Sequence, residues 1–484
     1  MQENLKAKTV SGMIWSALQR FGTMGISFVS NIVLARLLTP DDYGCIGMLA
    51  IFITVSNTFV NGGFGSALIQ KKEPTEKDYS TIFWWNLFIS IVLYGVLFIS
   101  APAISRFYNI PLLESVLKVQ GIVLIINAFN IVQTNQLRKT INFKRLATIH
   151  IASNIIAATI AIVLAYMSWG VWALVAQRII ANLIASILLL FMNRWVPSLC
   201  FSIESFKQLF NFGSFILASN LINTFCNNIQ GLLIGKFFNP ATMGYYTQAS
   251  KLEEIASHSI SSVVDQVSYP IFSKLQSDNN SMKNAIKKIT LSLSYITFPM
   301  MMILILVAEP LIMLVYGEQW LPCISYFQIL CIGGIAMCIY NIHYFTVAAK
   351  GESKKIFYWT VIKRSIGIAV LVIGFYFFDV IGLICGCAIT SWIILFINMY
   401  LVSKCVNYKL FTQIKDIFPI IILSVFCFCI SYIFSQIINF NIYIKGTIIL
   451  IFYFFSYITL SLLFRLKAFL LLKNIIAKYN IIKY

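Results

Sequence analysis

The chain has 484 residues, of which 59% are hydrophobic and only 11% are charged, and its formal net charge is +19. A soluble globular protein carries about 25% charged residues, so this much apolar surface must face lipid rather than water. Composition therefore excludes a soluble globular protein, and the recurrence of apolar stretches along the whole chain excludes a single anchored soluble domain.

Charged residues, prolines and glycines divide the chain into about 14 apolar stretches of membrane-spanning length, which we interpret as transmembrane helices. The first is too long for a cleaved signal peptide, so we expect it to be retained. The hairpin expected at Ser168–Gly170 is tight. The predicted helices are 11–35, 43–69, 80–105, 113–136, 146–167, 170–193, 208–235, 241–270, 286–308, 324–348, 356–378, 380–403, 414–437 and 443–464.

The basic residues are unevenly divided between alternate connections of these helices. With the N-terminus inside, most of the 36 lysines and arginines fall on the inner side. Those on the outer side are Arg36, Arg106, Lys236 and Lys445. This is the positive-inside pattern, so we predict an inner-membrane protein with both termini cytoplasmic, and the basic charge gives no reason to expect nucleic acid as a partner.

Two connections share one sequence pattern and indicate an internal repeat. The segment 36–44 reads RLLTPDDYG and the segment 236–244 reads KFFNPATMG, and each follows an odd-numbered helix on the outer side. Arg138 to Arg145 has a looser counterpart in Lys350 to Lys355. We therefore predict an all-α membrane fold of two six-helix repeats around a central cavity, with two added helices. The expected divisions are 1–200, 201–408, 409–467, and a basic amphipathic cytoplasmic tail at 468–484, for which a disordered tail is the alternative.

Polar residues recur at helical spacing on the opening helices of both repeats. They are Ser16, Arg20, Thr23, Ser27 and Asn31 in 11–35, Asn57 and Asn61 in 43–69, Asn220, Asn223, Asn227 and Gln230 in 208–235, and Lys251, Glu254, His258, Ser261 and Asp265 in 241–270. Such stripes predict that these helices line a hydrated cavity. Hydrogen bonding between helices, without water, is the alternative for serine and asparagine.

That alternative is weaker for Arg20 and Lys251, because a cation within a membrane needs a partner or water. A cationic cavity implies an anionic ligand, since arginine binds phosphate oxygens in bidentate fashion and lysine acts as a point charge. We predict that the substrate-binding residues are Arg20, Lys251, Arg178, Asn57, Asn223 and Asn227. The candidate residues for coupling to protons or sodium are Glu254, His258 and Asp265.

Three further cations within the predicted helices have simpler interpretations. Lys118 follows Glu114 by one helical turn, so a local ion pair is expected. Lys363 and Arg364 are expected to extend to the inner headgroups. The eleven cysteines have no metal-ligand spacing, and histidines are too few to form a cluster. The sequence therefore gives no reason to expect a metal, a cofactor or a disulfide framework.

Several segments resemble a known transporter family. Residues 11–16 (SGMIWS), 34–44 (LARLLTPDDYG), 63–71 (GFGSALIQK), Gly244-Tyr-Tyr and 269–276 (YPIFSKLQ) are similar to the polysaccharide transporters of the multidrug/oligosaccharidyl-lipid/polysaccharide flippase superfamily, especially the branch near the colanic-acid flippase. The resemblance covers roughly residues 9–405. It implies alternating access and outward movement of an undecaprenyl-pyrophosphate-linked oligosaccharide. It also implies membrane lipids as partners, and we expect a polymerase and glycosyltransferases of the same pathway.

Two other functions remain open at this point. A multidrug antiporter of the same fold usually places an acid on its first or seventh helix, and none is present here. A polysaccharide polymerase or ligase is an enzyme with a sizeable outer loop rich in basic residues, whereas the outer loops here are short. We therefore expect a transporter rather than an enzyme.

Overall fold

The computed structural model describes residues 2–71, 73–351, 353–438 and 440–473. Within these ranges the chain is all-α, as predicted. It divides into two compact units, Met1–Thr247 and Gln248–Tyr484.

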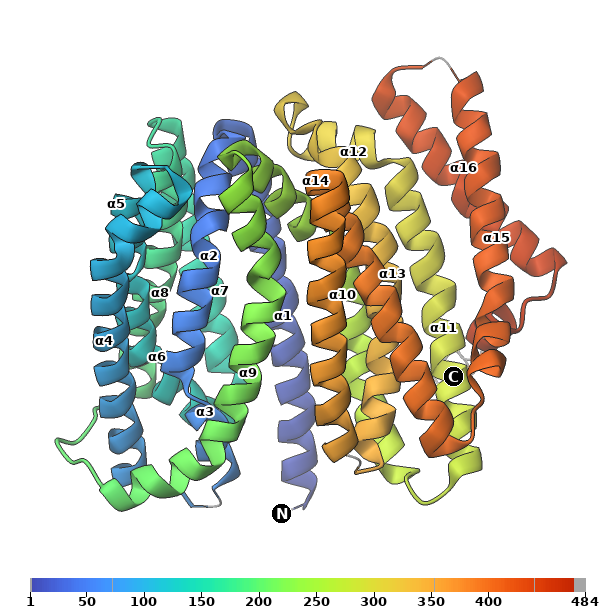
Figure 1. Cartoon of the computed structure of the whole chain (residues 1–484). Coiled ribbons are helices and arrows are strands. Elements are labelled where there is room, and N and C mark those ends of the chain that lie inside the picture. The colour runs from blue at the N-terminus through green and yellow to red at the C-terminus, as the bar shows by residue number, and fades with distance from the viewer. Residues whose placement is uncertain (1, 72, 352, 439, 474–484) are drawn as a thin grey trace. The chain divides into compact units, whose positions relative to one another are not determined.

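The first unit contains nine helices and the beginning of a tenth among its described residues (Figure 1). Within it α7 packs against α1 and α8, α6 against α4 and α8, and α9 against α2. The helices are α1 (Gln2–Leu37), α2 (Pro40–Asn61), α3 (Phe64–Gln70), α4 (Glu76–Tyr108), α5 (Leu112–Gln120), α6 (Ile122–Lys139), α7 (Phe143–Tyr166), α8 (Val171–Asn193), α9 (Ile203–Phe237) and the start of α10 (Pro240–Lys274).

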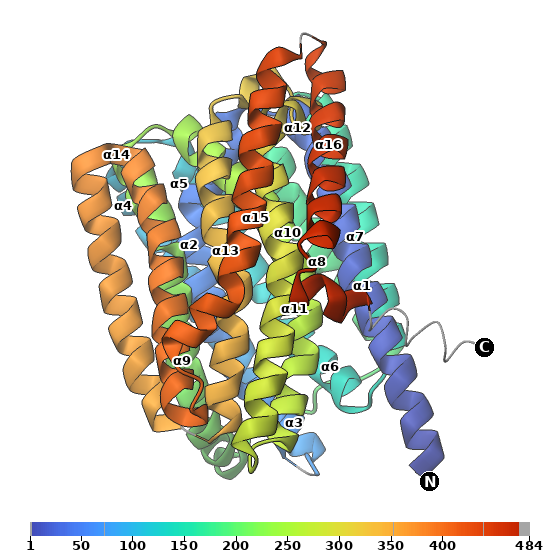
Figure 2. The same ribbon diagram turned by 90° about the vertical axis from the view of Figure 1, so that its right-hand side faces the viewer.

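The second unit continues α10 and adds the appended helices. In it α13 packs between α11 and α14, and Figure 2 shows α15 and α16 together beside α11. The helices are α11 (Asn279–Leu306), α12 (Ala308–Val315), the 3-10 turn η1 (Glu318–Trp320), α13 (Cys323–Ala349), α14 (Ser353–Val406), α15 (Leu410–Ile437) and α16 (Ile442–Leu463). Residues 467–473 are also helical, whereas 474–484 of the predicted tail lie outside the described residues.

Among the described residues, 10 helices are long and apolar enough to cross a membrane, and 11 if the bent helix α9 is included. Among these 10 helices α14 is counted once, and α1 and α10 are not included. These two helices carry Arg20 and Lys251, within the polar stripes that the sequence predicts to line a cavity. The multi-pass fold is therefore confirmed, and the number of fourteen remains a prediction.

The helix α14 is a hairpin rather than one straight helix. Its backbone leaves helical geometry at Phe378 and Asp379, between the predicted helices 356–378 and 380–403. Beyond this turn the two halves approach closely, because a Cβ on Gly382 would lie 2.0 Å from the carbonyl oxygen of Gly374. The turn between α7 and α8 has the same unusual conformation, with φ 53° and ψ −131° at Gly170 and φ 53° and ψ −137° at Asp379.

The two segments with the repeated sequence pattern also share local structure. Thr39 caps α2 by accepting a hydrogen bond from the Asp42 amide, and Asn239 accepts one of 2.8 Å from the Thr242 amide at the start of α10. Proline occupies the first helical position in both, where its missing N–H costs nothing. The same sequence pattern therefore forms the same helix start twice.

These two helix starts contact each other reciprocally within the first unit. A Cβ on Gly44 would lie 1.8 Å from the carbonyl oxygen of Pro240, and a Cβ on Gly244 would lie 2.0 Å from that of Pro40. Real side chains do not approach a backbone so closely, so glycine is required at both positions. The repeated Pro-x3-Gly pattern thus encodes a close backbone crossing.

Candidate functional site

Two predicted arginines have exposed side chains in the first unit. Arg20 lies on α1 and Arg178 on α8, and these helices are linked by a 3.3 Å hydrogen bond from Gln177 Nε2 to Ser30 Oγ. Neither arginine forms an ion pair with a described residue. A guanidinium without a carboxylate partner retains its donors for the oxygens of an anionic ligand.

Asn57 is part of a polar connection between helices of the first unit. Its Oδ1 accepts a 2.9 Å hydrogen bond from Nδ2 of Asn127 on α6. One position later, the hydroxyls of Thr58 on α2 and Thr224 on α9 lie 3.1 Å apart. This is the hydrogen bonding between helices that the sequence left as the alternative to a hydrated cavity. The structure therefore brings α2, α6 and α9 together through polar groups.

Asn223 and Asn227 flank Thr224 on α9. Asn223 is partly buried and Asn227 is exposed. Both lie in the first unit with Arg20, Arg178 and Asn57, whereas the remaining predicted substrate residue, Lys251, lies in the second. The predicted substrate residues are thus divided between the two units.

In the second unit, α10 carries the predicted polar stripe. Lys251 is partly buried, and Glu254 and His258 are exposed. Glu254 lies within electrostatic range of both Lys251 and His258. The side chain of Asp265 is outside the described part of the chain. The stripe therefore combines a partly buried cation with an exposed carboxylate and an exposed imidazole.

The other cations within the predicted helices have two different outcomes. Lys118 forms the expected ion pair with Glu114, with Nζ and Oε1 2.6 Å apart. The interpretation of Lys363 was wrong: its side chain is 7% exposed and donates a 2.7 Å hydrogen bond to Asn398 Oδ1 within α14. The hairpin places an amide acceptor beside the lysine, so the ammonium has no need to extend to the headgroups.

Two further polar residues of the membrane helices were not selected from the sequence as site residues. Asn127 lies on α6, outside the four striped helices, and only the fold places it beside Asn57. Glu253 adjoins Glu254 in sequence but is 6% exposed, because neighbouring positions on a helix point about 100° apart. A charged residue within a predicted membrane helix was the available signal for Glu253. The sequence alone could not show that Glu253 lies on a buried face of the helix and its neighbour on an exposed one.

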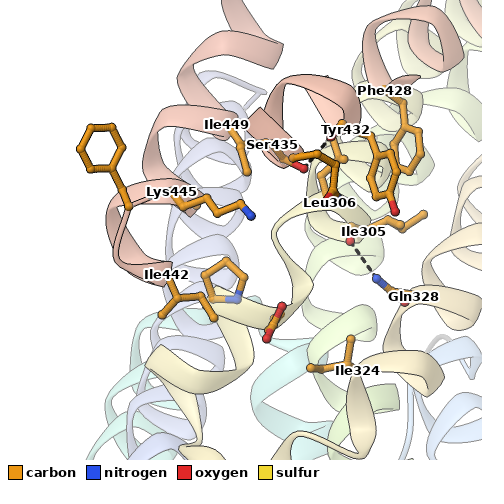
Figure 3. Close-up of a pocket in the computed structure, with 15 residues that line it drawn as sticks. Ile305, Leu306, Ile324, Gln328, Phe428, Tyr432, Ser435, Ile442, Lys445 and Ile449 are labelled. Atoms are coloured by element: carbon orange, nitrogen blue, oxygen red, sulfur yellow. Dashed lines mark hydrogen bonds between the residues drawn. The ribbon is translucent and has the colours of Figure 1, made fainter. Parts of the chain in front are cut away.

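The second unit also contains a cavity with a volume of about 480 Å³ where α15 and α16 meet α11 to α13 (Figure 3). Lys445 extends into it from α16, and Glu309 of α12 is another lining residue. Gln328 of α13 donates a 3.1 Å hydrogen bond to the Ile305 carbonyl. None of these residues was among the predicted site residues. The cavity is amphipathic, since aliphatic side chains and aromatic rings share its wall with the polar side chains of Ser435 and Gln436.

Comparisons with known proteins give the family. Residues 33–325 match the polysaccharide biosynthesis protein family. The teichuronic acid biosynthesis protein TuaB of Bacillus subtilis is 28% identical over 358 residues, which cover 74% of each chain. The succinoglycan biosynthesis transport protein ExoT of Rhizobium meliloti is 25% identical over 366 residues, covering 75% of this chain and 74% of ExoT.

The fold agrees with a solved membrane transporter. The structure of the lipid II flippase MurJ in its inward closed conformation matches with a TM-score of 0.77 at 15% identity, covering 94% of this chain and 99% of MurJ. At that identity the match shows the fold alone. The family match extends over more than half of the chain, and the predicted resemblance is confirmed. The chain therefore belongs to the polysaccharide biosynthesis protein family and has the all-α fold of the multidrug/oligosaccharidyl-lipid/polysaccharide flippase superfamily.

Proposed function

We propose that the chain moves an undecaprenyl-pyrophosphate-linked oligosaccharide from the cytoplasmic to the outer leaflet of a bacterial inner membrane, by alternating access, for surface polysaccharide synthesis. The observation that carries this proposal is the family match over residues 33–325. Relatives named for teichuronic acid biosynthesis and succinoglycan transport, and a fold shared with a lipid II flippase, support it.

The chemistry of the candidate residues fits such a substrate. The exposed guanidinium groups of Arg20 and Arg178 can each donate two hydrogen bonds to a pyrophosphate. Lys251 adds a positive charge from the second unit. Amides such as Asn223 and Asn227 can both donate to and accept from sugar hydroxyls. Binding and reorientation need no bond to be broken, so the proposed activity is transport and not catalysis.

The proposed architecture follows the predicted divisions. Six-helix lobes at 1–200 and 201–408 enclose the cavity, residues 409–467 add two helices, and both termini face the cytoplasm. Alternating access then opens the cavity to one leaflet at a time. The expected protein partners are the glycosyltransferases that complete the lipid-linked unit on the inner side and the polymerase that consumes it on the outer side.

The two rival functions fit less well. A multidrug antiporter exporting cations would be opposed by the arginines on α1 and α8, which repel a cationic drug. A polymerase or ligase is disfavoured by the family relatives, of which one is named as a transport protein. The same substrate lipid would serve a polymerase, so the test must separate movement from polymerisation.

Deletion of the gene in its own host provides that test. Loss of a flippase should abolish the surface glycan and leave complete lipid-linked units accessible only from the cytoplasmic side. Loss of a polymerase should instead leave single units exposed on the outer face. Normal surface glycan after deletion, or single units displayed outside, would contradict the proposal. The intact gene supplied on a plasmid should restore polymer export.

A further inference from the structure

Among the described residues of the second unit, Glu253 has the most buried carboxyl group, and this group forms no ion pair with them. It is 6% exposed, and its Oε1 accepts no hydrogen bond from them. The adjacent Glu254, which points about 100° away around α10, is exposed. Polar groups in a membrane interior that lack partners are costly, so a residue of this kind points to a function.

The carboxyl lies directly against the backbone of α13. A Cβ built on Gly334 would lie 2.1 Å from Glu253 Oε1 and 3.3 Å from Met301 Cε of α11. The carboxyl therefore occupies space that any side chain at position 334 would fill. The neighbouring Gly333 allows a similar approach to α14, because a Cβ built on Gly333 would lie 3.0 Å from the Ala388 Cα. The two glycines thus let α13 pack between the carboxyl and α14.

Among the described residues, the groups that act on this carboxyl include no cation. On α10 they are the Ser257 hydroxyl, which can hydrogen-bond the carboxyl, and the acid Glu254. On α13 the titratable neighbour is the thiol of Cys331, and the α11 neighbour is the thioether Met301. The buried cation of this unit, Lys363, donates to Asn398 instead. An ionised Glu253 would therefore be repelled by Glu254, and the neutral Cys331 thiol and the Met301 thioether would not solvate it.

We propose that Glu253 holds a proton in this arrangement of the second unit, so that the α10–α13 contact at Gly334 is a proton-binding site. A neutral carboxylic acid can pack against Gly334 and Met301 at little cost, whereas the carboxylate needs water or a cation. A bound sodium ion fits less well, because it needs several oxygen ligands and the described surroundings offer one hydroxyl beside the carboxyl. Release of the proton must then separate α10 from α13.

This site would couple a proton to the proposed flipping. The proton site itself does not depend on the proposed function, and only its consequence for transport rests on that function. A ligand shifts a conformational equilibrium only through its different affinities for the two states. The Glu253 carboxyl binds the proton in the arrangement in which α10 contacts Gly334. It releases the proton in the arrangement in which water reaches the carboxyl. Translocation would then respond to a pH gradient, by up to about tenfold per pH unit for one exchanged proton.

The test is infrared difference spectroscopy of the full chain in lipid bilayers, which needs no substrate. As the pH is raised from about 5 to about 9, the C=O stretching band of a protonated carboxylic acid should disappear. Glu253→Gln should remove this band, Glu253→Asp should keep a shifted one, and the matched neighbour Glu254→Gln should keep it unchanged. A band indifferent to Glu253→Gln would overturn the proposal. Its loss on adding sodium at constant pH would overturn it in favour of a sodium site.

A transport measurement then separates coupling from flipping itself. In proteoliposomes, translocation by the native chain should respond to an imposed pH gradient, and translocation by Glu253→Gln should not change with that gradient. If the native chain flips the lipid with no response to the gradient, coupling fails while the proposed function stands. If the native chain does not flip the lipid but the band is assigned to Glu253, the proton site stands and the proposed function fails.

Discussion

At the scale of single residues, the cations of the membrane helices differ in the partners that the fold gives them. Lys118 has a carboxylate one turn away, and Lys363 has the amide of Asn398. Arg20 and Arg178 are exposed without an ion pair among the described residues. A satisfied cation contributes to structure, whereas an exposed one without a counterion can bind an anion. The first two predictions concern the proposed substrate cations and the buried Lys363.

Replacing Arg20 or Lys251 by alanine should impair export of the glycan while the protein still accumulates in the membrane. Loss of one charged contact to the pyrophosphate costs about 2 kcal/mol, which corresponds to about thirtyfold in affinity. Surface glycan, normalised to protein in the membrane fraction, is the measurement. Lys118→Ala is the matched control and should be mild, and full export by the double alanine variant would remove both residues from the mechanism.

Asn398→Leu should destabilise the second unit more than its change in volume explains. It leaves the Lys363 ammonium buried without its acceptor, which costs about 1–3 kcal/mol. The double variant Lys363→Met, Asn398→Leu should recover most of that loss, because neither polar group remains. Thermal unfolding of purified protein measures both. Equal stability losses in the single and double variants would show that the hydrogen bond does not matter.

At the scale of helices and turns, much of the local structure could be predicted and most of the side-chain environment could not. Charged residues and glycines predicted helix breaks at 168–170 and between 378 and 380, and both turns exist. The similarity of 138–145 and 350–355 also has a structural counterpart. Lys139 donates to the Leu68 carbonyl after α2, and Lys350 donates to the Gln276 carbonyl after α10. In each repeat, a lysine at the end of a helix thus donates to a backbone carbonyl of the corresponding earlier segment.

The short helices and the buried polar groups show the limits of prediction from sequence. The predicted helix 113–136 consists of α5 and α6, and residues 64–70 form the separate helix α3. Short breaks of this kind barely change hydropathy, so the pattern cannot reveal them. Burial of Glu253 depends on Gly334, which is distant in sequence, and one sequence carries no record of that contact. Residue type and helical spacing identified candidates that are exposed or partly buried, and did not identify the buried Glu253.

The reciprocal contact between residues 36–44 and 236–244 gives a prediction about glycine. Alanine at position 44 or 244 would place its Cβ about 2 Å from a proline carbonyl oxygen, so the two helix starts must separate. We expect each substitution to cost about 1–3 kcal/mol, as for other overpacked sites. Fluorescence-detected thermal stability is the measurement.

Gly95→Ala is the matched control for these variants. It lies within α4, and a Cβ there would meet nothing within 4 Å. Alanine is also the better helix former, so this variant should be neutral or slightly stabilising. If Gly44→Ala and Gly244→Ala were as stable as Gly95→Ala, the close crossing would not be a feature of the protein in its membrane.

At the scale of the whole molecule, fold and orientation rest on different kinds of observation. The all-α multi-pass fold follows from the helices and from the match to MurJ. The orientation rests on the distribution of lysine and arginine, which places most basic residues on one side. The orientation with cytoplasmic termini is a prediction. It can be tested without any substrate.

We expect a cysteine at Glu318, in η1, to react with a membrane-impermeant maleimide added to intact cells. A cysteine at Lys144, near the start of α7, should react only after lysis, because that connection is predicted to face the cytoplasm. Both variants are made in a background without the eleven native cysteines. Labelling of position 144 in intact cells would reverse the predicted orientation.

The most direct measurement of the central claim is translocation by the purified chain. A bacterial undecaprenyl-pyrophosphate oligosaccharide is incorporated into proteoliposomes, and the glycan facing outward is assayed with a membrane-impermeant sugar-modifying enzyme. We predict that vesicles with the native chain expose the inner pool over time. In empty vesicles and in vesicles with the Arg20→Ala, Lys251→Ala double variant, only the outer-leaflet lipid should react, which is about half of the total. Equal exposure with and without the native chain would contradict the proposal that this protein flips the lipid.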